Sequence, residues 1–239
     1  MMKLRIFPRM EGGVVALFVL SILQFVTYFV YSHALNGLKE EIFEGLQRTT
    51  MVLRTLLDTE AHQQLTDRSQ ESTLLYQDQI TPLKAAQASD STLEFVYTMV
   101  QRDTTIYFIL DPTDSTELDD TGAGLKSHIM DPYPGASFEV KECFRTQEIT
   151  ITEEVYEDQW GQHISCFVPI LHNSEMVGVL GVDISAKTYQ ERLEPIKNAY
   201  RRTAITIFCI AYIAGLIMWF LRRFQHSLIK KVLAFTPEP

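Results

Sequence analysis

The 239-residue sequence lacks the motifs of common catalytic sites. It contains no G-x-S-x-G, no H-E-x-x-H, no phosphate-binding glycine loop and no credible Ser/His/Asp order. Its six histidines are scattered, and its three cysteines do not have zinc-ligand spacing. We therefore expect a protein that is not an enzyme, with no cofactor and no metal site.

Cysteine is scarce, so no disulfide framework is expected. Cys209 falls in an apolar run, whereas Cys143 and Cys166 lie in a segment where oxidation is permitted. Two alternatives are open for this pair: a disulfide, or two separate, buried and inert thiols. The second is favoured.

Charge is absent from two long apolar runs, residues 12–31 and 203–221. Each is close to the roughly 20 residues that a helix needs to cross a bilayer. The first run is longer than the apolar part of a signal peptide and is not followed by a good cleavage site. The sequence therefore predicts uncleaved transmembrane helices over residues 12–32 and 203–221.

Basic residues are sparse between these runs and concentrated outside them. Three precede the first run and four follow the second, which leaves 14 of the 21 basic and 28 of the 30 acidic residues between, a net charge of −14. By the positive-inside rule the tails, 1–11 and 222–239, belong in the cytoplasm and the middle lies outside. Such an acidic segment is a poor partner for nucleic acid.

Helical periodicity dominates the first part of the outer segment. Apolar residues recur at helical spacing over 35–57, which predicts one helix continuing from the first span. Its stripe is suited to packing on the domain or on the same helix of a second chain, so a homodimer through this stalk is expected. Residues 33–91 form the stalk and further helical pieces, with Pro82 marking a break or the first turn of a new helix.

Strand patterns follow. Alternating, β-branched and aromatic residues predict strands, Ser137 caps a short helix, and Ser185 begins a helix that Pro195 kinks or divides. The resulting α+β domain has a five-stranded antiparallel sheet. The predicted elements are strands 93–101, 105–111, 149–156, 162–171 and 176–184, a loop at 111–135, a helix at 137–147 and an exit helix over 189–202.

Five stretches in order, EFVYTMV, IYFILDP, DQWG, ISCFVPI and VGVLGVDIS, resemble the Cache sensor domains. The likeness extends over residues 61–188, with the core at 92–188, and it implies a PAS-like sheet between two membrane spans. It also implies a domain outside the bacterial inner membrane that binds a small organic molecule. Occupancy would then be relayed to a histidine kinase, cyclic-nucleotide cyclase or chemotaxis output.

Only about 18 residues follow the second run, too few for such an output domain. Two explanations stay open: the sequence is a fragment, or the sensor works through a separate cytoplasmic output protein. A different function also stays open, namely a membrane-anchored module that docks a periplasmic partner or a sister receptor.

The strand M-V-G-V-L-G-V-D-I-S, residues 176–185, carries the strongest candidate site residue. Alternation places Gly181 and Asp183 on one face, so a gap is expected beside a carboxylate. The resemblance implies that Asp183 receives an amine of the ligand. The competing interpretation is that Asp183 accepts backbone amides at the start of the next helix.

Other candidates for the pocket are aromatic or lie in the 111–135 loop. For each, a structural role in the core, at the rim or in solvent is an open alternative. Arg102 and Arg145 suit a ligand carboxylate but are expected to pair with surface acids. The aspartates of the loop fit turns better than calcium. The candidate ligand-binding residues are Asp183, Trp160, Tyr97, Tyr107, Tyr133 and His128.

Overall fold

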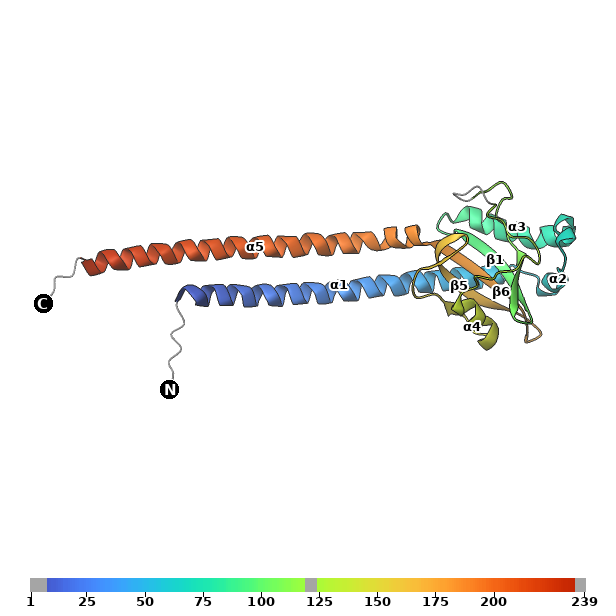
Figure 1. The fold of residues 1–239 in the computed structure, drawn as a ribbon, viewed down its shortest axis with the longest axis horizontal. Helices are drawn as coiled ribbons and strands as arrows, with labels where there is room; N and C mark the ends of the chain where they lie inside the picture. Colours follow the sequence, from blue (N-terminus) through green and yellow to red (C-terminus); the bar gives the residue numbers. More distant parts are fainter. Residues whose placement is uncertain (1–7, 119–123, 235–239) are drawn as a thin grey trace. The chain divides into compact units, whose positions relative to one another are not determined.

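The structure, a computed structural model, describes residues 8–118 and 124–234 (Figure 1). It divides into two compact units. One is Leu38–Arg192, which holds the sheet, and the other joins the chain up to Gly37 with the chain from Leu193 onwards. The predicted tails lie partly outside the described residues, at 1–7 and 235–239.

The second of these units consists of parts of two long helices, α1 (Pro8–Arg54) and α5 (Ala186–Ala234). Both helices are long and apolar enough to cross a membrane. Their large apolar side chains are not covered by protein; Phe18 is 66% and Phe208 62% exposed. Within the unit, the Tyr31 and Tyr200 rings stack 4.3 Å apart. Tyrosine rings of this kind favour the membrane–water interface.

The sheet is antiparallel, and its main path has the order β2-β1-β6-β5-β3. The α+β class and the two long helices of the prediction are confirmed. The strands are β1 (Phe95–Arg102), β2 (Thr105–Leu110), β3 (Thr150–Ile151), β4 (Tyr156–Asp158), β5 (Gly161–His172) and β6 (Glu175–Ser185).

One predicted strand, 149–156, is split into β3 and the short β4, both paired with β5. The buried Thr152 directly follows β3. Its hydroxyl accepts the Ser165 N–H at 2.8 Å, and its own N–H donates to the Ser165 carbonyl. Glu153 and Glu154 follow and are exposed. Two adjacent glutamates cannot alternate into a buried face, so the chain leaves the sheet before β4 begins.

Helices cover the two faces of the sheet. Ile42, Leu46 and Leu53 of α1 are buried in the sheet-bearing unit. The predicted stripe on this helix thus packs on its own domain, the first of the two alternatives. On the opposite face, α4 (Phe138–Thr146) buries Val140 and Cys143, and the Ser137 hydroxyl caps it as predicted.

Three helical pieces connect α1 to the sheet: α2 (Thr59–Gln63), the 3₁₀ turn η1 (Arg68–Ser72) and α3 (Leu74–Ser89). Asp58, Asp67 and Thr73 cap them. The prediction of a break or a helix start at Pro82 is wrong, because this residue lies inside α3. Proline removes one N–H donor from a helix, and burial of Tyr76, Ile80 and Leu83 offsets that loss.

β6 runs into α5 without a loop, since β6 ends at Ser185 and α5 begins at Ala186. The Ser185 hydroxyl accepts the Thr188 N–H at 3.1 Å, so Ser185 is the predicted cap. Pro195 does not divide the helix, which continues to Ala234. Cys143 and Cys166 are free, buried thiols, as favoured.

The two glycines of β6 make room for rings. A Cβ atom on Gly181 would lie 2.5 Å from Cε2 of Tyr97, its cross-strand neighbour. On the other face, a Cβ atom on Gly178 would lie 2.7 Å from the Met99 carbonyl oxygen and 3.0 Å from Cε1 of His62. The gap expected beside Asp183 is therefore filled by the Tyr97 ring.

Replacing Gly181 with alanine should destabilise the protein. The new methyl group must displace a buried ring, which costs on the order of 1–3 kcal/mol of unfolding free energy. The matched control is Gly45→Ala in α1, where nothing lies within 4 Å of the new Cβ atom. That change should stabilise by about 0.5–1 kcal/mol. Thermal unfolding of the full chain in detergent, followed by circular dichroism, measures both; an unchanged melting temperature for Gly181→Ala would contradict the close fit.

Candidate functional site

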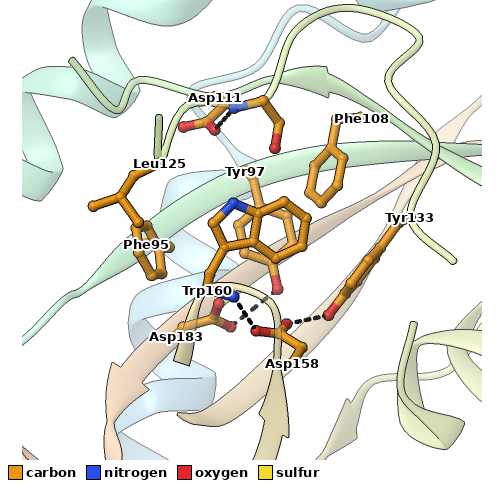
Figure 2. A pocket seen from close by; sticks show the side chains of 10 residues that line it. Phe95, Tyr97, Phe108, Asp111, Leu125, Tyr133, Asp158, Trp160 and Asp183 are labelled. Carbon is orange, nitrogen blue, oxygen red and sulfur yellow. Dashed lines mark hydrogen bonds between the residues drawn. The ribbon is translucent and has the colours of Figure 1, made fainter. Parts of the chain in front are cut away.

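A small pocket lies between one face of the sheet and the 111–135 loop (Figure 2). Strands β1, β2 and β6 supply its floor, the β4–β5 turn supplies one wall, and the described parts of the loop, 111–118 and 124–135, supply the rest. Aromatic and acidic side chains dominate the lining. The lining residues are Phe95, Tyr97, Phe108, Asp111, Leu125, Ser127, Tyr133, Asp158, Trp160 and Asp183.

Four of these rings pack together, and Phe108 contacts the other three. The ring centroid of Phe108 lies 5.5 Å from that of Tyr97, 5.1 Å from Tyr133 and 5.2 Å from Trp160. Tyr133 and Trp160 are themselves 5.3 Å apart. Most of these pairs meet edge to face, the arrangement that the aromatic quadrupole favours. We call Tyr97, Phe108, Tyr133 and Trp160 the aromatic box.

Asp183 is a buried carboxylate beside the aromatic box, only 3% exposed. Its Oδ1 accepts the Tyr97 hydroxyl at 3.1 Å. Burial raises the pKa of Asp183 to about 7, although the charge of His163 acts in the opposite direction. The alternative role for Asp183 was to accept backbone N–H groups at the start of α5. Ser185 fills that role instead, and no described N–H group donates to the Asp183 carboxylate.

Asp158, at the β4–β5 turn, is hydrogen-bonded to two residues of the aromatic box. Its Oδ2 accepts the Tyr133 hydroxyl at 2.6 Å, and its Oδ1 accepts the backbone N–H of Trp160 at 2.9 Å. Burial alone would raise the pKa of Asp158, but the nearby His163 and the hydrogen bonds from Tyr133 and Trp160 lower it below its usual value. Asp158 is therefore ionised at neutral pH.

His163 is a buried cation behind these two acids. Its Nδ1 lies 2.9 Å from Glu94 Oε2, and its Nε2 lies 3.5 Å from Asp158 Oδ1. Burial acts to lower the pKa of His163, but the contacts with Asp158 and Glu94 raise it to about 10. The imidazolium offsets part of the negative charge of the site.

Asp111 belongs to the fold of the loop. Its carboxylate accepts the N–H groups of Ser127 at 2.6 Å and Thr113 at 2.9 Å, and burial raises its pKa. The loop also pairs with β2, where the Tyr133 N–H bonds the Ile106 carbonyl at 2.8 Å. These bonds place Tyr133 and Leu125 over the sheet.

Four of the six predicted ligand-binding residues, Asp183, Trp160, Tyr97 and Tyr133, line this one pocket. Tyr107 does not, because strand alternation turns its neighbour Phe108 inward and leaves Tyr107 on the other face of β2. His128 does not either; its Nδ1 lies 3.0 Å from Glu71 Oε2 and ties the loop to η1.

Both arginine candidates are away from the pocket, since Arg145 pairs with Glu142 and Arg102 is exposed at the end of β1. No lysine or arginine lines the pocket among the described residues. Asp111 and Asp114 accept hydrogen bonds from turn amides, as expected of loop aspartates. Asp119 and Asp120 lie outside the described residues, and within those ranges no cluster suited to a metal ion occurs.

Sequence reasoning missed Phe95, Phe108, Asp158 and His163. Phe95 is the direct cross-strand partner of Asp183, so the register of β1 and β6 was the signal that could have found it. Asp158 and His163 lie on either side of the β4–β5 turn, and the contact between them depends on where that turn falls.

The pocket is nearly filled by its own side chains. The space open to the centre of a water-sized sphere is about 20 Å³, enough for one or two waters but not for an organic ligand. An occupied state therefore requires a side chain of the wall to move.

No family model matches the chain, and no curated protein matches it. Among solved structures, the sensory domain of the Campylobacter jejuni chemoreceptor Tlp3 with isoleucine bound is 16% identical, with a TM-score of 0.44 over 80% of this chain and 67% of that one. The Tlp3 ligand-binding domain in complex with L-valine is 18% identical, with a TM-score of 0.45 over 80% and 68%. The Escherichia coli DcuS sensor domain is 17% identical, with a TM-score of 0.42 over 63% and 96%.

These structures are sensory and ligand-binding domains, the class of domain that the sequence resembles. All three TM-scores are below 0.5.

The raised pKa of Asp183 predicts how stability depends on pH. The unfolded chain loses this proton near its usual pKa of 3.8, whereas the folded chain keeps it until about pH 7. Stability should therefore fall as pH rises between these values and level off above them. Asp183→Asn lacks this loss, so its stability relative to the native chain should increase by about 3 kcal/mol between pH 5 and pH 8.

Chemical unfolding of the full chain at several pH values measures that difference. The exposed Glu153→Gln variant is the control and should show a constant offset. His163 titrates in both the native chain and the variant, so most of its contribution cancels. A pH-independent offset for Asp183→Asn would show that Asp183 is ionised throughout.

Proposed function

We propose that this chain is a membrane-anchored sensor whose domain between the two spans binds a small organic cation, an amine or quaternary ammonium compound. One observation carries the proposal: the buried Asp183 carboxylate lies against the aromatic box in a pocket that no described lysine or arginine lines. A buried carboxylate whose charge is offset only in part, by His163, favours a ligand that supplies further positive charge.

The aromatic box supports the same ligand class. Ring faces of tryptophan and tyrosine attract an ammonium group by several tenths to about 2 kcal/mol each. Asp158 and Asp183 add two carboxylates on one side of the pocket, and His163 offsets only one of them. The pocket suits an amine better than a carboxylic acid, since a ligand carboxylate would meet acidic side chains there and no described lysine or arginine.

The connection from β6 to α5 supports a signalling role. Asp183 lies three residues before α5 begins, and α5 contains the second candidate span. A ligand that binds two conformations of the site with unequal affinity shifts their populations. The end of β6 then passes the change in conformation directly to α5. Occupancy is then relayed across the membrane to a kinase, cyclase or chemotaxis output.

The charge pattern supports the orientation of the chain. Basic flanks at both ends favour cytoplasmic termini, with the acidic sensor domain on the periplasmic side of a bacterial inner membrane. A homodimer through the stalk, residues 35–57, remains part of the proposal. It would use the exposed side of α1, where Val52 is 62% and Met51 46% exposed, since Ile42, Leu46 and Leu53 are buried in the domain.

Binding of amines can be tested by thermal shift of the full chain in detergent. Choline, tetramethylammonium, putrescine and succinate serve as probes. A bound amine at about 100 times its Kd should add about 2.7 kcal/mol of stability and raise the melting temperature by several degrees, whereas succinate should not. Asp183→Asn should abolish the rise, and the exposed control Glu153→Gln should keep it.

If no amine shifts the native chain and a periplasmic protein is recovered with it as a stable complex, the docking function replaces this proposal.

A further inference from the structure

A larger hollow lies directly outside the pocket. We call it the outer groove; it has a volume of about 400 Å³ by the same measure that gives about 20 Å³ for the pocket. Four residues line both: Phe108, Leu125, Ser127 and Trp160. The groove falls within the roughly 300–1,000 Å³ range of small-molecule sites, and the pocket is far below it.

Trp160 has the largest side chain of these four. Figure 2 shows its indole lying across the pocket, between the Phe95 and Leu125 side and the Phe108 and Tyr133 side. The ring packs on Phe108 and Tyr133 at centroid distances of 5.2 and 5.3 Å. Among the described residues no acceptor bonds the indole N–H, so the side chain is held by packing. A ring held in this way can turn without breaking a buried hydrogen bond.

Two features of the backbone flank Trp160: a glycine with a positive φ follows it, and one hydrogen bond, which we call the fastening, holds its own N–H group. Gly161, the next residue, has φ +135°, a conformation that side chains rarely adopt. On the other side, the Asp158 carboxylate accepts the Trp160 N–H at 2.9 Å and the Tyr133 hydroxyl at 2.6 Å. The position of the indole thus depends on the carboxylate that faces the pocket.

We propose that Trp160 is the residue that sets the size of ligand the site accepts, by separating the pocket from the outer groove. When the indole turns aside, pocket and groove become one site, with an ammonium group beside Asp183 and the rest of the ligand in the groove. The groove is lined there by Gln159, Lys126 and Asp131, so it suits a polar or uncharged extension. The ligand class rests on the proposed function; the movement of Trp160 does not.

The movement can be tested without any ligand. The chain has two tryptophans, and Trp219→Phe leaves Trp160 as the only one. In that background, acrylamide quenching of the full chain in detergent reports how accessible the indole is. Asp158→Ala removes the fastening and should raise the quenching constant at least twofold. Asp158→Asn keeps an acceptor oxygen and should leave it within about a third of the starting value.

A quenching constant that is unchanged in Asp158→Ala, with the circular dichroism spectrum also unchanged, would overturn the gating role. If Asp158→Ala fails to fold, the conservative variant decides: Asp158→Asn that quenches as strongly as free tryptophan would equally overturn it.

Size selection is tested with ethylammonium and tetraethylammonium as probes on the full chain. In the native chain the smaller cation should bind more tightly. Trp160→Ala should raise the affinity ratio of tetraethylammonium to ethylammonium at least fivefold, and Trp160→Phe should fall between. The ratio cancels most of the loss of cation–π attraction common to both probes.

An unchanged ratio would overturn the role of Trp160 in size selection. If neither cation binds any variant, the ligand class of the proposed function fails with the size-selection role, and the quenching result still decides whether Trp160 moves.

Discussion

The burial of one carboxylate, Asp183, constrains most of the sensor domain. Moving an isolated carboxylate out of water is costly, and the protein compensates only in part. The Tyr97 hydroxyl donates one hydrogen bond, and His163 supplies a positive charge at a distance. To bring Tyr97 there, β6 must carry a glycine at 181, and to hold His163 as a cation the domain needs Glu94 and Asp158. Several otherwise unrelated residue choices thus have one electrostatic origin.

The same constraint explains why the pocket is small and yet aromatic. Rings exclude water from the carboxylate while presenting electron-rich faces to whatever replaces the proton. In the closed state the rings pack on each other, as the distances around Phe108 show. Under the proposed function, binding of a cation would exchange ring–ring contacts for ring–cation contacts, which would lower the cost of opening the site.

The sequence predicted the elements that repeat with a clear period. The strand at residues 176–185, the helix continuing out of the first span and the Ser137 and Ser185 caps all follow from local patterns. The gap at Gly181 beside Asp183 was also predicted. What fills that gap was not, because the ring of Tyr97 arrives through strand pairing, which a single sequence does not state.

Tyr107 shows most clearly what local sequence patterns cannot predict. A tyrosine and a phenylalanine stand side by side in β2, and one step of register decides which of them faces the pocket. In the sequence, Asp158 is only one of many acids near a turn. Its role depends on two hydrogen-bond donors and the His163 cation, which meet at one carboxylate from separate positions in the chain. Pro82 failed as a break signal because burial of its neighbours outweighs one missing hydrogen bond.

The direct passage from β6 into α5 has a mechanical consequence. A flexible connector would absorb small displacements of a strand end as changes in its own torsion angles. Here Ser185 is the last strand residue and Ala186 the first helical one, so no flexible loop residue separates the strand from the helix. A rotation of the end of β6 would therefore act directly on the first turn of α5, with no intervening loop residues to absorb it.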